Sequence, residues 1–123
     1  MISVAEALVI HDLLIEFFGG SKGIRDKPSL QSALSRPFQT FEQKNLYPSP
    51  EDKTAAILES IVVNHPFIDG NKRMGYILMR MTLLQYGIDL QSTEDEKFNI
   101  IMMVVKGEMN FEQIREWIKD NMK

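Results

Sequence analysis

The sequence predicts an all-α protein, a compact bundle of about six helices forming one domain over residues 1–123. Three observations support this class. Helix-capping residues recur along the chain, apolar residues at helical spacing follow each of them, and no sustained alternation of apolar and polar residues indicates a long strand. With 44% hydrophobic and 25% charged residues, the composition is that of an ordinary globular domain.

The first two helices are predicted from caps and breakers. Ser3, with Glu6 three residues later, has the capping-box pattern that opens a helix, and the pair Gly19-Gly20 ends it. Asp26 can cap a second helix. This helix must end before Pro37, because proline disfavours helical geometry in the residue that precedes it.

The two central helices flank a polar stretch. Ser49 is followed by a proline and two acids, an order typical of a helix start. The helix that it opens runs to about Asn64 and ends there, because Pro66 restricts the residue before it. A fourth helix begins around Gly70, carries apolar residues at helical spacing and ends before Gly87.

Two further helices complete the bundle. Thr93 with Glu96 caps the fifth, and Asn110 with Gln113 caps the sixth. The only segment that could be extended lies at residues 36–47, which we expect to form a loop or a short hairpin.

Composition limits the function. The chain has no cysteine, which removes disulfides and thiolate chemistry and fits a reducing cytoplasm. The net charge is −3 without a basic run, so nucleic-acid binding is not expected. No apolar run approaches the roughly 20 residues of a membrane span, and the N-terminus lacks the basic start of a signal peptide. We therefore expect a cytoplasmic protein with no membrane association.

The stretch NHPFIDGNKRMG, Asn64 to Gly75, concentrates reactive side chains at the start of the fourth helix. A helix N-terminus has unpaired N–H groups and a partial positive charge, which suit phosphate. Lys72 and Arg73 are unfavourable there for stability, since cations repel that end of the dipole. Their presence favours an anion site, to which a planar guanidinium and a compact ammonium both contribute.

The other residues of this stretch divide the chemistry. Asp69 is a hard oxygen ligand suited to one position on Mg²⁺. Asn71 can donate to a phosphate oxygen, and His65 can accept a proton from a hydroxyl nucleophile. Phe67 is expected to point inward as an anchor. Phosphoryl-type transfer requires such positioning and charge neutralisation.

Each of these residues also has an ordinary structural explanation. A histidine before a proline is commonly a loop residue, Asp-Gly is commonly a turn, and Lys-Arg is commonly a solvated surface. A zinc site built on His65 and Asp69 is disfavoured, because the only other histidine, His11, lies on an apolar helix and is expected to be structural. All of these explanations would have to hold together within one helix start, so we favour a functional site.

The nine residues from His65 to Arg73 resemble the signature HPFx(D/E)GN(G/K)R of the Fic/Doc family, and the form with lysine resembles its Doc ("death on curing") branch. Weaker matches, including Gly19-Gly20 and Arg36-Pro37-Phe38, extend the resemblance over nearly the whole chain. The resemblance implies a Fido fold in which the signature joins two central helices.

Residue roles follow from this resemblance. It makes His65 the general base, Asp69 the Mg²⁺ ligand, and Asn71, Lys72 and Arg73 contacts to the nucleotide phosphates. Gly70 would line the anion cradle. The flap that docks the target protein by strand-like pairing corresponds to the segment carrying Arg36, Pro37, Phe38 and Phe41.

The resemblance also suggests the reaction. Family members that transfer AMP have glycine where this chain has Lys72, and a second arginine where it has Tyr76. With lysine, the Doc branch acts with an inverted nucleotide as a protein kinase. We therefore favour phosphoryl transfer from ATP to a Ser or Thr hydroxyl of a target protein, with translation components among the candidate targets. AMP transfer and a non-catalytic binding module are the alternatives.

Regulation is expected to come from a separate protein. Self-restraining family members carry (S/T)xxxE(G/N), but residues 92–97 of this chain lack the final residue of that pattern and form a helix cap instead. The resemblance then implies a Doc-like toxin that is neutralised in trans by a small antitoxin, whose disordered tail folds on binding.

Overall fold

The computed structural model describes residues 1–123 and confirms the all-α class. Its six α-helices are α1 (Val4–Phe18), α2 (Lys27–Ser35), α3 (Pro50–Asn64), α4 (Asn71–Leu84), α5 (Glu94–Val105) and α6 (Phe111–Asn121). Between α2 and α3 lie a short 3-10 helix, η1 (Arg36–Phe38), and two short strands, β1 (Thr40–Phe41) and β2 (Lys44–Asn45). None of the helices combines the length and apolar character that a membrane span requires.

Side-chain caps begin every helix except α4. Capping boxes open α1, α3, α5 and α6, each at the residue that the sequence predicts. Asp26 caps α2 by accepting a hydrogen bond from the Ser29 N–H at 3.2 Å. Helix α4 follows Gly70, which has φ 78° and no side chain to cap it. Local sequence therefore determines five helix starts, whereas the sixth, that of α4, depends on its surroundings.

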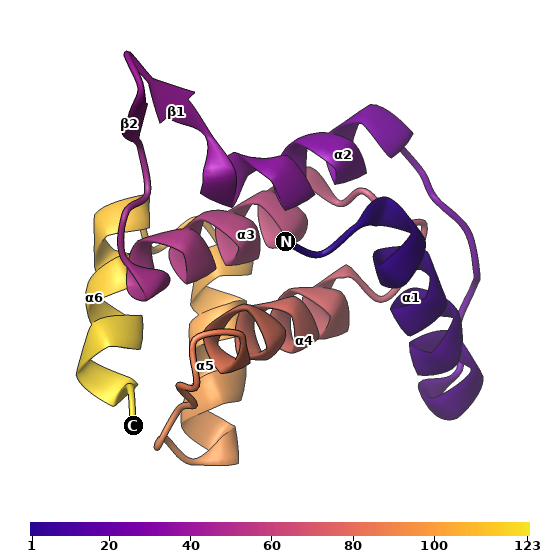
Figure 1. Ribbon diagram of the computed structural model, residues 1–123. Coiled ribbons are helices and arrows are strands. Elements are labelled where there is room, and N and C mark those ends of the chain that lie inside the picture. Colours follow the sequence, from indigo (N-terminus) through magenta and orange to yellow (C-terminus); the bar gives the residue numbers. More distant parts are fainter.

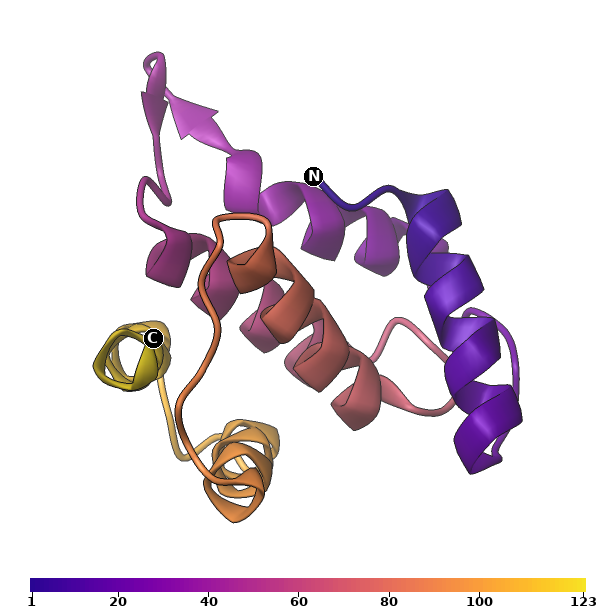
Figure 2. The same cartoon turned by 60° about the horizontal axis from the view of Figure 1, so that its bottom comes forward.

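Helices α3 and α4 run through the centre of the molecule, with α1 and α2 on one side and α5 and α6 on the other (Figure 1, Figure 2). One hydrophobic cluster joins the first pair of helices to the centre, and a second cluster joins the last pair to it. Nine of the 15 residues of α3 are buried, as expected for a helix that is covered on both sides. The two central helices fix the ends of the connection between them.

The segment 36–47 contains the short hairpin that the sequence left open. Strands β1 and β2 pair antiparallel, with Thr40 opposite Asn45. The turn residues Glu42 and Gln43 have φ 50° and 67°, which is the backbone of a two-residue type I′ turn. Such turns usually carry Asn-Gly, so this one had no clear sequence signal.

Close packing of α3 against α4 depends on Gly75. A Cβ added there would lie 2.6 Å from Val62 Cγ2 and 3.3 Å from Leu58 Cδ1. Alanine is favoured over glycine inside a helix by about 1 kcal/mol, so helix propensity does not explain this residue. Glycine at position 75 is needed because α3 passes close to it.

We expect Gly75→Ala to lower the free energy of unfolding by about 1–3 kcal/mol, because overpacking outweighs the gain in helix propensity. Denaturant unfolding followed by far-UV circular dichroism measures this change. Gln31→Ala, at an exposed position of α2, is the matched control and should change the free energy by less than about 0.5 kcal/mol. A Gly75→Ala protein as stable as the wild type would contradict the close approach of the two helices.

Candidate functional site

The connection between α3 and α4, residues 65–70, is held by strand-like pairing with an earlier part of the chain. The Pro66 carbonyl accepts a hydrogen bond from the Arg25 N–H at 2.8 Å, and Ile24 forms an antiparallel bridge with Phe67. The connection therefore has a fixed path, although it contains no helix or named strand of its own.

His65 ends α3 in a strained backbone conformation. Its φ of 49° and ψ of 60° lie in the left-handed region, which residues other than glycine rarely adopt. Pro66 disfavours helical geometry at this position. The Arg25 guanidinium donates to the carbonyl oxygens of Asn64 at 2.5 Å and His65 at 2.6 Å. These contacts hold the strained residue, and its side chain is exposed.

Phe67 and His11 fasten the connection to α1. Phe67 is fully buried, and its ring stacks on that of His11 with the centroids 4.1 Å apart. The His11 Nε2–H donates to the carbonyl oxygen of Asp69 at 2.8 Å. His11 is therefore a buried structural residue, as the sequence predicts, and it holds the connection through Phe67 and the Asp69 carbonyl.

The amide of Asn71 closes the connection on itself. Its Oδ1 accepts a hydrogen bond from the Phe67 N–H at 3.0 Å, and its Nδ2 donates to the Phe67 carbonyl at 2.9 Å. The sequence predicts that this amide donates to a phosphate oxygen, and it gives no sign of these two backbone contacts. One hydrogen on Nδ2 remains for a ligand, so the phosphate contact stays a prediction.

Asp69 presents an oriented carboxylate at the surface. Its Oδ1 accepts from the Gly70 N–H at 2.8 Å, and its Oδ2 accepts from the Ser21 N–H at 3.1 Å. Gly20 allows this approach, since a Cβ there would lie 2.5 Å from Asp69 Oδ2. No group of three or more His, Cys, Asp or Glu side chains that could hold a metal ion is present. A cation bound to Asp69 would take its other ligands from a bound anion and water.

A cleft of about 630 Å³ opens beside the connection and the first turns of α4. The residues predicted to act on a nucleotide all line it, namely His65, Asp69, Gly70, Asn71, Lys72 and Arg73. The remaining lining residues are Ile68, Tyr76, Glu94, Lys97, Phe98 and Ile101. The histidine is therefore not walled off, and the predicted groups face one space of ligand size.

The N-terminal end of α4 carries two cations that form no ion pair. Its first turn contains no acidic residue and no side chain caps it, so unpaired N–H groups and the positive end of the helix dipole lie at the cleft. Lys72 and Arg73 are exposed, and neither forms an ion pair. The guanidinium carbon of Arg73 lies 4.3 Å from the centroid of the Phe18 ring. This end of the cleft favours an anion.

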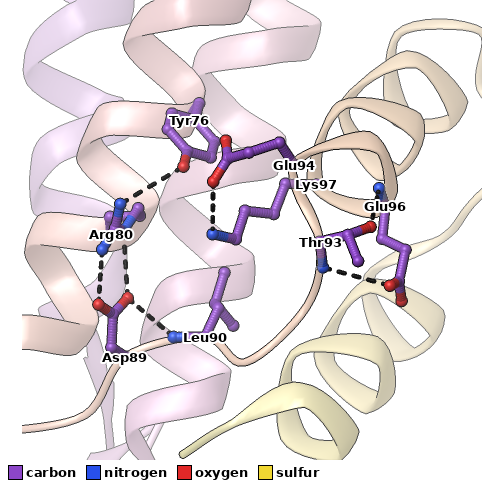
Figure 3. Close-up of polar contacts among 8 residues, drawn as sticks. All are labelled: Tyr76, Arg80, Asp89, Leu90, Thr93, Glu94, Glu96 and Lys97. Atoms are coloured by element: carbon purple, nitrogen blue, oxygen red, sulfur yellow. Dashed lines mark hydrogen bonds and ion pairs between the residues drawn. The ribbon is translucent and has the colours of Figure 1, made fainter.

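Residues of α5 line one side of the cleft, and the sequence alone does not predict this. The side chains of Glu94 and Lys97 extend from α5 toward Tyr76 of α4 and form an ion pair of 3.1 Å (Figure 3). Their i,i+3 spacing was visible in the sequence, but such pairs occur on many helix surfaces. Only the packing of α5 against α4 makes this pair part of the cleft.

A second ion pair fastens α4 to the chain that leads into α5. Arg80 donates to Oδ1 of Asp89 at 3.1 Å and to Oδ2 at 2.5 Å (Figure 3). The hydrogen bonds from Arg80 and from the Leu90 N–H hold the pKa of Asp89 below its usual value. Tyr76 joins this group through its hydroxyl, 3.5 Å from Arg80 Nη1. The start of α5 is thereby tied to the helix that carries the cations.

Two of the four predicted flap residues are built into the fold. Arg36 turns inward, where it donates to Glu59 at 2.9 Å and to the Tyr47 hydroxyl at 3.0 Å. Pro37 is buried beside it. These residues anchor the segment that leads to the hairpin, a role that the sequence analysis did not assign to them.

The other two flap residues are exposed but lie away from the cleft. Phe38 and Phe41 are 38% and 66% exposed, and neither lines the cleft. The hairpin precedes the first residue of α3, whereas His65 follows its last, and a 15-residue helix is about 22 Å long. Figure 1 shows the hairpin at the opposite end of α3 from the connection. The target-docking role of Arg36, Pro37, Phe38 and Phe41 stays a prediction.

The fold and the site define an all-α domain in which an exposed histidine and a carboxylate adjoin an uncapped, cationic helix N-terminus. A family model described as the Fic/DOC family matches residues 1–83, which extend from α1 almost to the end of α4. The chain therefore belongs to the Fic/DOC family. Helices α5 and α6 lie outside this match, so one family domain over residues 1–123 remains a prediction.

Individual relatives agree with this family. The chain is 37% identical over 78 residues to a protein named Toxin Doc from Mycolicibacterium smegmatis (strain ATCC 700084 / mc(2)155), which covers 63% of this chain and 60% of that protein. It is 51% identical over 39 residues to a Fido domain-containing protein from Dictyostelium discoideum, which covers 32% of this chain and 27% of the relative. The chain thus spans less than two thirds of the length of each relative.

We expect His65→Gly to raise the free energy of unfolding by about 1 kcal/mol, because glycine adopts the left-handed conformation without the steric cost that histidine bears. Thermal unfolding should show this as a Tm higher by a few degrees. His65→Ala keeps a Cβ and serves as the control, which should show no such gain. A His65→Gly protein less stable than His65→Ala would contradict the strain assigned to this residue.

Proposed function

We propose that the protein is a nucleotide-dependent transferase that moves a phosphoryl group from ATP to a Ser or Thr hydroxyl of a target protein. One observation carries the proposal: the His65 imidazole, the Asp69 carboxylate and the cations Lys72 and Arg73 line a single cleft at an uncapped helix N-terminus. Phosphoryl transfer depends mainly on positioning, neutralised charge and a proton acceptor. These are the groups that the cleft contains.

In the proposed reaction His65 accepts the proton of the target hydroxyl. The hydroxyl oxygen forms a bond to the γ-phosphorus of ATP, and the bond from that phosphorus to its bridging oxygen breaks, which releases ADP. Lys72, Arg73 and the N–H groups of α4 neutralise the phosphate oxygens. Asn71 contributes its remaining amide hydrogen, and Gly70 turns the backbone into the first turn of α4.

The residues of the cleft fit a magnesium–nucleotide complex. Asp69 offers one oriented oxygen ligand, and Mg²⁺ in nucleotide sites is usually held by one or two carboxylates together with phosphates and water. When bound, the ion would supply further neutralisation of the phosphate charge. The cleft volume of about 630 Å³ suits a nucleotide, since ligand pockets commonly range from roughly 300 to 1,000 Å³.

Lys72 is the reason for favouring phosphoryl transfer over AMP transfer. Its side chain brings bulk and charge to the place where AMP-transferring members of the family carry glycine, and Tyr76 brings no charge where they carry a second arginine. AMP transfer to a protein hydroxyl is the second candidate. A binding module without activity is the third, and the strained conformation of His65 weighs against it, because simple binding does not require an imidazole there.

We further infer that the protein acts as a toxin on a translation component and is restrained by a small antitoxin. The 37% sequence identity over 78 residues to a protein named Toxin Doc supports this inference. The start of α5 supports it as well, because Thr93 and Glu96 there form a helix cap rather than the glutamate motif with which some family members restrain themselves.

Labelled ATP distinguishes the candidate reactions. With cell lysate as the source of target, we expect label from the γ-phosphate, and none from the α-phosphate, to enter protein. His65→Ala should reduce transfer by at least about 100-fold, and Lys72→Gly should impair it. Lys106→Gly, at the exposed C-terminal end of α5, is the control and should retain transfer. Entry of the α-label would instead establish AMP transfer, and no entry of either label would rule against an enzyme.

Growth of bacteria that express the protein tests the toxin. We expect the wild type to arrest growth and His65→Ala to permit it, as measured by colony counts after induction. Co-expression of the open reading frame adjacent to its gene should restore growth, and its product should co-purify with the protein. Equal toxicity of the wild type and His65→Ala would show that the arrest does not depend on transfer.

A further inference from the structure

The α5 side of the cleft contains a buried cation with incomplete hydrogen bonding. The Lys97 side chain is only 8% exposed and lines the cleft. An ammonium group has three donors, yet Lys97 makes a single hydrogen bond, to Glu94 Oε1 at 3.1 Å. Buried charges are usually paired and fully hydrogen-bonded, because removing them from water is costly. Lys97 therefore has donors left for a further anionic partner.

The present partner of Lys97 lies mainly in solvent. The Glu94 side chain is 81% exposed and belongs to the first turn of α5. An exposed carboxylate in a single ion pair is weakly held, since water competes well for it. Glu94 can therefore turn away from the cleft at small cost, whereas Lys97 remains buried. The cleft then loses one negative charge and keeps the positive one.

Other carboxylates near Lys97 are already engaged. Asp89 is held by two hydrogen bonds from Arg80, and Glu96 accepts from the Thr93 N–H at 3.2 Å in the capping box. Figure 3 shows Asp89 below Arg80 and Glu96 turned to the other side of the start of α5. Glu94 is therefore the one carboxylate of this group that can exchange with an incoming anion.

We propose that Lys97 binds a phosphate group of the nucleotide from the α5 side of the cleft, and that Glu94 occupies this ammonium until the nucleotide arrives. Lys72 and Arg73 act on the same ligand from α4. The identity of the ligand rests on the proposed function. The residue itself does not come from the family match, because Lys97 lies beyond residues 1–83.

Isothermal titration with Mg²⁺ and the non-transferable analogue adenosine 5′-(β,γ-imido)triphosphate tests the proposal on the full chain. We expect Lys97→Met to weaken binding by at least about tenfold, because a charge-assisted contact is lost. Glu94→Gln should tighten binding by about threefold, because the competing carboxylate is gone. Glu96→Gln, which removes an equal charge outside the cleft, is the control and should leave the affinity unchanged.

If Lys97 had only a structural role, Lys97→Met and Glu94→Gln would not change the affinity for the analogue in opposite directions. Circular dichroism establishes which variants fold, and Lys97→Gln is the second variant if Lys97→Met does not. In a Lys97→Met background Glu94→Gln should tighten binding less than it does alone, as a double-mutant cycle measures. If neither Lys97 variant folds, the Glu94→Gln arm decides, and unchanged affinity there overturns the proposal.

The same titration separates this proposal from the proposed function. If the wild type binds the analogue and Arg73→Gln weakens binding but the Lys97 variants do not, the nucleotide site stands and the role of Lys97 is wrong. If the wild type does not bind the analogue at all, the proposed function fails, and the assignment of Lys97 fails with it.

Discussion

The site depends on the pairing of the α3–α4 connection with the segment that follows α1. The Arg25 guanidinium donates hydrogen bonds to the end of α3, and backbone hydrogen bonds between residues 23–26 and residues 66–68 fix the path of the connection. Because these contacts are mostly between backbone atoms, the side chains of His65 and Asp69 remain directed outward. Phe67, which lies between them, is buried on His11. The connection is thus held on its buried side, and it exposes the side chains of His65 and Asp69 to solvent on the other.

Three local choices at this place oppose stability. His65 has a left-handed backbone, α4 starts without a side-chain cap, and its first turn carries cations where acids would be favoured. Elsewhere four helices open with capping boxes and two hydrophobic clusters form the core, and the hairpin turn Glu42-Gln43 is the other place where residues other than glycine adopt positive φ. Several such departures at one cleft are expected of a functional site, because residues selected for function are kept there although they lower stability.

The sequence was sufficient where structure is determined locally. Caps such as Ser49 and Asn110 specify helix starts within four residues, and the signature brings its reactive groups together because they are neighbours in the chain. Contacts between distant segments could not be predicted in this way. The placement of Lys97 in the cleft depends on how α5 packs on α4, and the two backbone bonds of Asn71 depend on the path of the connection. The hairpin within residues 36–47 is one of the two forms expected for that segment, and its turn could not be located from the sequence because Glu42-Gln43 adopts a backbone that usually requires Asn-Gly.

The contact between Arg73 and Phe18 has a consequence for how an anion would be received. A long side chain on a helix surface normally samples many rotamers, and ordering it costs up to about 2 kcal/mol. The aromatic face of Phe18 restricts that sampling before any anion is present, yet it consumes none of the five guanidinium N–H donors in a conventional hydrogen bond. Phe18, at the C-terminal end of α1, thus preorganises the Arg73 side chain of α4. This contact gives a role to a phenylalanine that is not buried.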